Sequence, residues 1–337
     1  MRRATAIGLG LATLIALVAC GGGGEDGQAP PAVLDEVQAS EAIAAAALRV
    51  AGALTELADD RMAVDQLGRA SFGGGCLHGT LTGSCGMGHR VNTLRVSARH
   101  CQLLDAVSGL RLTVEGRLTV TTPFAICGLG GLIPLEAVRT YRFDHFSATV
   151  EDGAGVVEAF AAERLVETLL PLRTGCDQGD ATIDLDGTMS AQRRGGLDAA
   201  LRATDLHLER RGSGSAGACT RTIEARGGVA VDDRSAGRTA GADLDGLTVE
   251  VDAAGGLRRI DGGFALGCAR PLTIATDQPL VAGDGCPSAG MLELERRDGS
   301  RGFVDLAAGG LRVDADGDGT PDRVTADCRD LDIATCP

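Results

Sequence analysis

The side chains best placed to do chemistry lie in an acidic loop near the C-terminus. Asp314-Ala315-Asp316-Gly317-Asp318-Gly319-Thr320-Pro321-Asp322 places a side-chain oxygen at every second position. Calcium prefers hard oxygen donors, and alternate spacing lets one turn of chain bring several of them around one ion. We therefore predict a weak, structural Ca2+ site, which is the one cofactor expected. Its candidate ligands are Asp314, Asp316, Asp318, Thr320 and Asp322.

This loop resembles the Asp-rich calcium loops of EF-hand, dockerin and thrombospondin type 3 repeats. It has carboxylates at loop positions 1, 3, 5 and 9 and a glycine at position 6. Two features depart from the pattern: Thr325 stands at position 12 in place of a bidentate acid, and a strand-like segment precedes the loop. Asp327 could supply the missing carboxylate. The alternative is a solvated acidic turn, which Asp-Gly pairs form readily.

Cysteine is the second reactive residue type. The sequence has eleven cysteines, of which Cys20 belongs to the N-terminal signal region. The other ten are an even number, which in an exported chain indicates disulfides. Spacing does not determine their pairing, but we expect sequential neighbours to pair because short loops close readily. The ten are Cys76, Cys85, Cys101, Cys127, Cys176, Cys219, Cys268, Cys286, Cys328 and Cys336.

Zinc is the alternative use of the first cysteines. Cys76-x-His78, Cys85-x-x-x-His89 and His100-Cys101 bring together the nitrogen and sulfur donors that zinc prefers. No C-x-x-C or H-x-x-x-H pair accompanies them, and an oxidising compartment would convert the thiols to disulfides. Disulfides are therefore the favoured interpretation.

The N-terminus has the order of residues found in a secretory signal. Arg2 and Arg3 precede an apolar run, Ala4–Ala19, that is too short to span a membrane and ends in small residues. The last residues, Leu17-Val18-Ala19-Cys20, then provide a cleavage site followed by a cysteine. We therefore expect the chain to be exported.

Leu17-Val18-Ala19-Cys20 resembles the lipobox of bacterial lipoproteins. In that family the signal is removed and the cysteine becomes the acylated first residue, which implies a signal peptide at 1–19 and a lipid on Cys20. Gly21 in place of Asp favours, by the same resemblance, the outer membrane. Residues 20–32 are Gly-rich and predict a flexible tether behind the acylated cysteine. The resemblance thus implies an envelope protein that binds the membrane through its N-terminal lipid.

Two periodicities divide the remaining chain. Residues 33–70 are rich in Ala with apolar residues at three- and four-residue steps, which predicts a helical segment that can break at Asp59-Asp60. In residues 71–337 apolar and polar residues alternate between Gly-rich turns, as in Leu247–Asp252, which predicts an antiparallel β body. Val156–Leu170 is an exception, because its spaced glutamates in an apolar run indicate a helix.

The predicted fold is mainly β: an elongated, curved antiparallel sheet with an N-terminal helical segment, stapled by disulfides. Gly116, Gly187 and Gly262 each follow an acidic residue within an alternating segment. A glycine there marks a bend or bulge, and repeated bends would curl the sheet. The glycines lie 71 and then 75 positions apart, which suggests an internal duplication.

Composition excludes several functions. The 32 basic residues are all arginine, which removes lysine-dependent phosphate loops and Schiff bases. A net charge of −14 and an aromatic content of 2% argue against a nucleic-acid partner. No catalytic residue is assigned: Gly212–Gly217 spells a dinucleotide-type motif without its βαβ setting, and His145 and His207 are expected to be surface or hydrogen-bonded residues.

These observations favour a non-enzymatic, lipid-anchored envelope protein with a structural or partner-binding role. The Cys-rich β body also resembles uncharacterised envelope proteins. The alternative is a carrier that holds an apolar ligand, such as a lipid, on a curved sheet. A hydrolase is the less favoured third class. Whether the partner is a protein or a lipid is not indicated by the sequence.

Overall fold

The computed structural model describes twelve segments of the chain: residues 35–59, 76–87, 92–104, 109–123, 138–170, 180–194, 198–214, 218–234, 238–267, 269–281, 287–307 and 310–325. The predicted signal peptide, Cys20 and the tether lie outside these residues.

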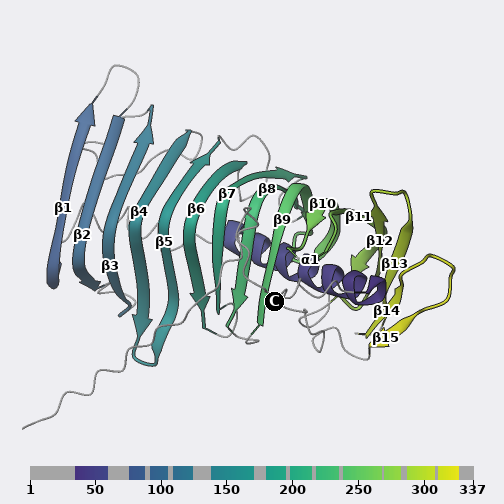
Figure 1. The fold of residues 1–337 in the computed structure, drawn as a ribbon. Coiled ribbons are helices and arrows are strands. Elements are labelled where there is room, and N and C mark those ends of the chain that lie inside the picture. The colour runs from purple at the N-terminus through teal and green to yellow at the C-terminus, as the bar shows by residue number, and fades with distance from the viewer. Residues whose placement is uncertain are drawn as a thin grey trace, which may run out of the picture. The chain divides into compact units, whose positions relative to one another are not determined.

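A single open antiparallel sheet makes up most of the described residues (Figure 1). Its fifteen strands follow one another in chain order, so that each strand pairs with its neighbours in the sequence. This confirms the predicted mainly β fold with antiparallel pairing. The strands are β1 (His78–Met87), β2 (Asn92–Leu104), β3 (Arg111–Thr122), β4 (Arg139–Asp152), β5 (Gly155–Leu169), β6 (Ala181–Arg193), β7 (Asp198–Ser213), β8 (Thr220–Asp233), β9 (Arg238–Val251), β10 (Leu257–Ala265), β11 (Leu272–Val281), β12 (Ala289–Arg296), β13 (Arg301–Ala307), β14 (Gly310–Asp314) and β15 (Arg323–Thr325).

The strands form because one face of the sheet is apolar and the other is solvated. Along β3, Leu112, Val114, Leu118 and Val120 are buried while the residues between them are exposed or half-buried. Successive side chains of a strand point to opposite faces, so this alternation assigns every second residue to the core. The largest aromatic cluster lies on the same face, where the Phe143 ring contacts other rings at centroid distances of 5.3 and 5.5 Å.

One helix, α1 (Glu36–Asp59), packs on this apolar face. Its residues from Ala42 to Ala47 are all at least 97% buried, so that the helix has no exposed stripe along this stretch. A helix that is apolar on every side is a core helix. The alanine side chains also let the helix axis approach the sheet closely. The described helix runs to Asp59, and the remainder of the predicted helical segment, residues 60–70, lies outside the described residues.

The helix axis crosses the strands. Its main contacts run from β7 through β10 and on to β13 and β14. A helix of 24 residues is ~36 Å long, and the seven spacings from β7 to β14 add up to ~34 Å. The length of α1 therefore matches the width of the strands that it covers. The segment Glu36–Thr55 is long and apolar enough to cross a membrane, but 67% of its apolar window is buried within the protein.

A row of β-bulges crosses the sheet from β1 to β10. The pairing register shifts within these strands, for example between Glu115 and Arg117 in β3 and between Ala225 and Gly227 in β8. Residues with positive φ occupy the row, and the three that are not glycine are His and Asp, types that tolerate this conformation. They are Gly79, His100, Gly116, His145, Gly187, Asp205, Gly227, Gly246 and Gly262.

The bulge row confirms that Gly116, Gly187 and Gly262 mark bends. It gives no support to a duplication with their spacing, because these glycines lie on β3, β6 and β10, three and then four strands apart. The bulges recur instead from one strand to the next.

The helix expected at Val156–Leu170 is wrong. These residues form β5, in which Glu158, Phe160 and Ala162 are buried and Leu165 continues the buried face beyond the bulge. Val157, Ala159 and Ala161 lie on the opposite face and are half-buried. Both faces of β5 are therefore apolar, and this removes the period-two signal of a strand.

Asp-initiated turns connect several strands. At the β4–β5 turn, Asp152 accepts two hydrogen bonds from the Arg194 guanidinium at 2.8 Å and one from the Ala154 N–H at 2.7 Å. The Arg194 hydrogen bonds, followed by that of Ala154, lower the pKa of Asp152 to about 2. The carboxylate therefore stays ionised under all ordinary conditions and holds the turn against the end of β6.

We expect Gly116→Ala to destabilise the protein by about 1–3 kcal/mol, the usual cost of a strained backbone position. Gly116 has a φ of 93°, and a Cβ there would lie 1.9 Å from the carbonyl oxygen of His145. The measurement is urea denaturation followed by circular dichroism.

Gly153→Ala is the matched control, because no atom lies within 4 Å of the added Cβ. It is expected to change stability by less than about 0.5 kcal/mol. Equal effects of the two substitutions would contradict the strain assigned to the bulge row.

Candidate functional site

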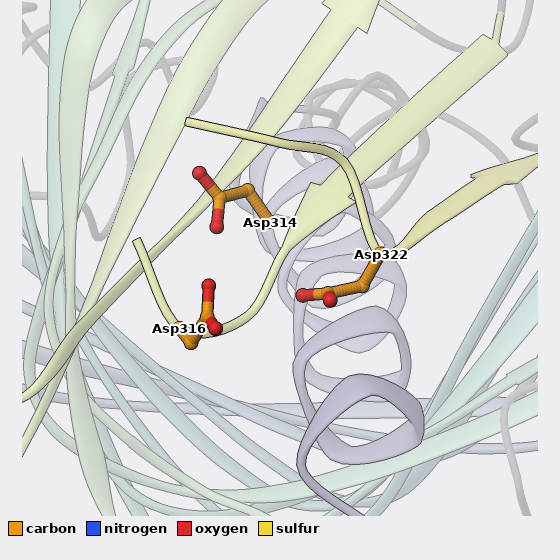
Figure 2. A group of neighbouring side chains, drawn as sticks. All are labelled: Asp314, Asp316 and Asp322. Atoms are coloured by element: carbon orange, nitrogen blue, oxygen red, sulfur yellow. The ribbon is translucent and has the colours of Figure 1, made fainter. Parts of the chain in front are cut away.

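The acidic loop lies between β14 and β15, close to the N-terminal half of α1 (Figure 2). Asp314 ends β14 and is 9% exposed, whereas Asp316 and Asp322 are exposed. One carboxylate oxygen from each of the three lies within 4.8 Å of the others. Figure 2 shows the three carboxylates around a common space. The structure thus brings together three of the five predicted ligands.

Backbone N–H groups orient these carboxylates. Asp314 accepts from the N–H of Gly317 at 2.7 Å and from that of Gly319 at 2.8 Å, one on each oxygen. Asp322 accepts from the Ala315 N–H at 2.7 Å, and its own N–H donates to the Val313 carbonyl at 2.8 Å. The loop is therefore closed on itself, with its first and ninth positions held side by side.

The other two predicted ligands are placed differently. Asp318 lies outside the three-carboxylate group, and its Oδ1 accepts from the Thr320 N–H at 2.7 Å. Asp318 thus caps the neighbouring backbone, as an ordinary Asx turn does. Three carboxylates this close repel one another, and a divalent cation would offset that repulsion. Calcium binding by Asp314, Asp316 and Asp322 stays a prediction.

Sequence reasoning missed the residues that join this loop to α1. The Arg296 guanidinium, at the end of β12, donates to the Ala315 carbonyl at 3.0 Å and to Ser40 Oγ at 3.2 Å. It also lies 3.4 Å from the Glu36 carboxylate. No local pattern points to Arg296, because its position beside a turn is typical of a solvated arginine.

A second connection comes from β15. Glu41 is 6% exposed within the apolar helix, and its carboxylate accepts from Thr325 Oγ1 at 3.0 Å. The Arg323 Nε lies 3.0 Å from the same carboxylate. A buried charge is destabilising unless it is paired, so these contacts explain how Glu41 is tolerated. In the sequence, the only indication of this contact is the position of Glu41, an acidic residue directly before the alanine-rich stretch.

The cysteines of the first hairpin are oxidised. Cys76 is bonded to Cys101, so the expected pairing of sequential neighbours is wrong for Cys76. Cys85 lies near the far end of β1, about 30 Å along an extended strand from Cys76, whereas the β1–β2 register places Cys101 beside the start of β1. Cys85 and Cys219 are also disulfide-bonded, with partners outside the described residues.

These bonds remove the thiolates that the alternative zinc site requires, since Cys76, Cys85 and Cys101 are all in disulfides. Six of the predicted disulfide cysteines lie outside the described residues: Cys127, Cys176, Cys268, Cys286, Cys328 and Cys336.

The histidines singled out in the sequence are surface residues in carboxylate pairs. His145 Nδ1 lies 2.9 Å from Asp144, and its side chain is 79% exposed. His207 Nδ1 lies 2.6 Å from Asp184. Gly212 belongs to β7, so the dinucleotide-type motif begins in an antiparallel strand and not in a βαβ unit. Both histidines are thus surface residues paired with a carboxylate, as expected.

No family model, no curated protein and no solved structure matches this chain.

We expect calcium to raise the melting temperature through Asp314, Asp316 and Asp322. Weak extracellular-type sites have dissociation constants of ~0.1–1 mM. At ~10 mM calcium, binding to the native state alone would add about 1.4–2.7 kcal/mol of stability. Calorimetric melting in calcium and in chelator provides the measurement.

Asp316→Asn should abolish the shift, because it removes one carboxylate of the group. Asp318→Asn is the matched control and should retain most of the shift, since Asp318 lies outside the group. Melting temperatures that are equal in calcium and in chelator for the unmodified chain would rule the site out.

Proposed function

We propose that this chain is an exported, lipid-anchored protein of the cell envelope with a structural or partner-binding role. Cys20 carries the lipid in this proposal, and the outer membrane is the favoured location. A binding role is supported by β1, a long edge strand that is ordered although nearly all of its side chains are exposed.

β1 differs from the strands beside it. Nine of its ten residues are exposed, and only Leu81 is half-buried. β2 in contrast alternates between buried and exposed residues. Ordering a backbone costs ~1–2 kcal/mol per residue, and β1 recovers little of this by burying side chains. Its order therefore depends on its ladder with β2 and on covalent bonds.

Disulfides supply the covalent bonds. Cys76–Cys101 fixes the start of β1 to β2, and Cys85, which lies in β1, is bonded to a cysteine outside the described residues. Closing a loop of about 25 residues is worth ~3 kcal/mol. Structural disulfides persist outside the cytosol, which supports export. A stapled strand with nine exposed residues is suited to presenting its edge to another chain.

The role of apolar carrier has weaker support. α1 lies across the apolar face, with its main contacts on β7 to β10, β13 and β14. A ligand on that part of the sheet would have to displace a helix of this protein. The aromatic cluster around Phe143 lies beyond the main contacts of α1, but its rings are buried within the protein, with Phe143 only 1% exposed.

Photo-cross-linking in intact cells tests the proposal. A photoreactive amino acid in place of Ser84 in β1 is expected to give a discrete cross-linked adduct, because the free edge contacts its partner there. The matched control places the same amino acid at Arg202, an exposed position of the central strand β7, where no free edge exists.

The Cys20→Ala variant serves as the control for anchoring and is expected to leave the membrane fraction. The proposal fails if position 84 gives no adduct beyond that at position 202, or if Cys20→Ala remains in membranes as fully as the unmodified chain.

A further inference from the structure

Cys85 is disulfide-bonded, and its partner is one of the cysteines outside the described residues. In β1 it stands opposite Leu94 of β2, which in turn pairs with Val120 of β3. Residues that stand opposite each other in a sheet share a face, so Cys85 lies on the same face as these two buried side chains. The partner therefore has to come within disulfide distance of this position, at the β1 edge of the sheet.

The chain leaves β3 close to Cys85. The strand register places Gly86 two strands away from Thr121, and Pro123 is two residues beyond Thr121, so that it lies ~14 Å from Cys85. Cys127 follows Pro123 by four positions, a length of chain that can span ~14 Å. Disulfide-bonded Cα atoms are ~4.4–6.8 Å apart. Cys127 is therefore within reach of Cys85.

Cys176 is the next cysteine along the chain, and it is too far away. The row of paired residues that starts at Gly86 continues to Thr182 of β6, five strands from β1. Asp180 is two residues beyond Thr182 and therefore lies ~26 Å from Cys85. Cys176 precedes Asp180 by four positions, again ~14 Å of chain. Even with the longest usual Cα separation of a disulfide, ~6.8 Å, it falls ~5 Å short.

The other cysteines outside the described residues belong to more distant strands. Cys268 and Cys286 are joined directly to described residues beside β10 and β12. β10 is nine strands from β1, or ~43 Å across the sheet. Cys328 and Cys336 follow β15 at the opposite edge, ~67 Å away across the sheet. The eleven positions from Thr325 to Cys336 span at most ~40 Å.

We propose that Cys85 and Cys127 form a disulfide that ties β1 to the chain segment between β3 and β4. Two thiols become one disulfide, with loss of two protons and transfer of two electrons to a protein disulfide of the exporting compartment. Together with Cys76–Cys101, this bond gives β1 a covalent link near each of its ends. Cys20 is set aside as a partner because it carries the lipid in the proposed function, and the inference rests on that function in this respect alone.

Peptide mapping of the full chain tests the pairing. The protein is purified in detergent without reductant, its free thiols are blocked, and it is digested with trypsin. Cys76 and Cys85 share the tryptic peptide 70–90. Mass spectrometry should find this peptide joined both to residues 100–111, through Cys101, and to residues 118–139, through Cys127. Residues 174–193, which contain Cys176, in place of residues 118–139 would overturn the proposal.

Thiol counts in unfolded variants provide a second readout. Cys85→Ser should expose one thiol more than the unmodified chain, because it leaves Cys127 without a partner. Cys85→Ser combined with Cys127→Ser should expose no additional thiol. Cys85→Ser combined with Cys176→Ser is the matched control and should expose two, since the two removed residues belong to different bonds. Two additional thiols in the first double variant, or none in the control, would overturn the pairing.

The same map separates this proposal from the proposed function. A bond between Cys85 and Cys20 would contradict both the pairing and the lipid anchor, because a cysteine in a disulfide cannot carry the lipid on its sulfur. A bond between Cys85 and any other cysteine contradicts the pairing alone, and the membrane anchoring tested by Cys20→Ala is then unaffected.

Discussion

The burial of α1 against the sheet is the constraint on which the described structure depends. Fifteen strands in chain order make a wide sheet with one apolar face, and such a face has to be covered. α1 crosses this face, with its main contacts on β7 to β10, β13 and β14, and its alanine side chains allow a close approach to the sheet. Most of the stability of a helix in a protein comes from packing, so the helix and the sheet stabilise each other.

The polar contacts at the N-terminal half of α1 determine where the helix lies. Glu41 is buried and requires Arg323 and Thr325, both on β15. Arg296 joins Ser40 to the carbonyl of Ala315 in the acidic loop. The position of the helix and the conformation of the loop are therefore coupled. A cation bound by the acidic loop would therefore also stabilise β14 and β15, the strands next to the N-terminal half of α1.

The sequence predicts much of this fold, because alternation is a direct consequence of a sheet with one wet face. The glycine of β3, Gly116, was recognisable as a bulge for the same reason. β5 was not predictable, since half-buried Val157 and Ala159 on its outer face remove the alternation. The pairing of Cys76 with Cys101 depends on the β1–β2 register, which no spacing rule supplies.

The candidate site, too, was predictable from the sequence only in part. Local spacing identified Asp314, Asp316 and Asp322, because the ligands of one loop are neighbours in sequence. It could not identify Arg296, whose contact with Ser40 joins residues 256 positions apart. Contacts of this range appear only once the strand order and the direction of the helix are known.

Hydrogen–deuterium exchange of the full chain tests the central claim most directly. If α1 is a core helix, amides in the peptide from Glu41 to Leu54 should exchange as slowly as those of β8 and β9, which it covers. Exchange of that peptide at the rate of a solvent-exposed helix, with β8 and β9 still protected, would show that α1 does not hold the sheet together and would contradict the account.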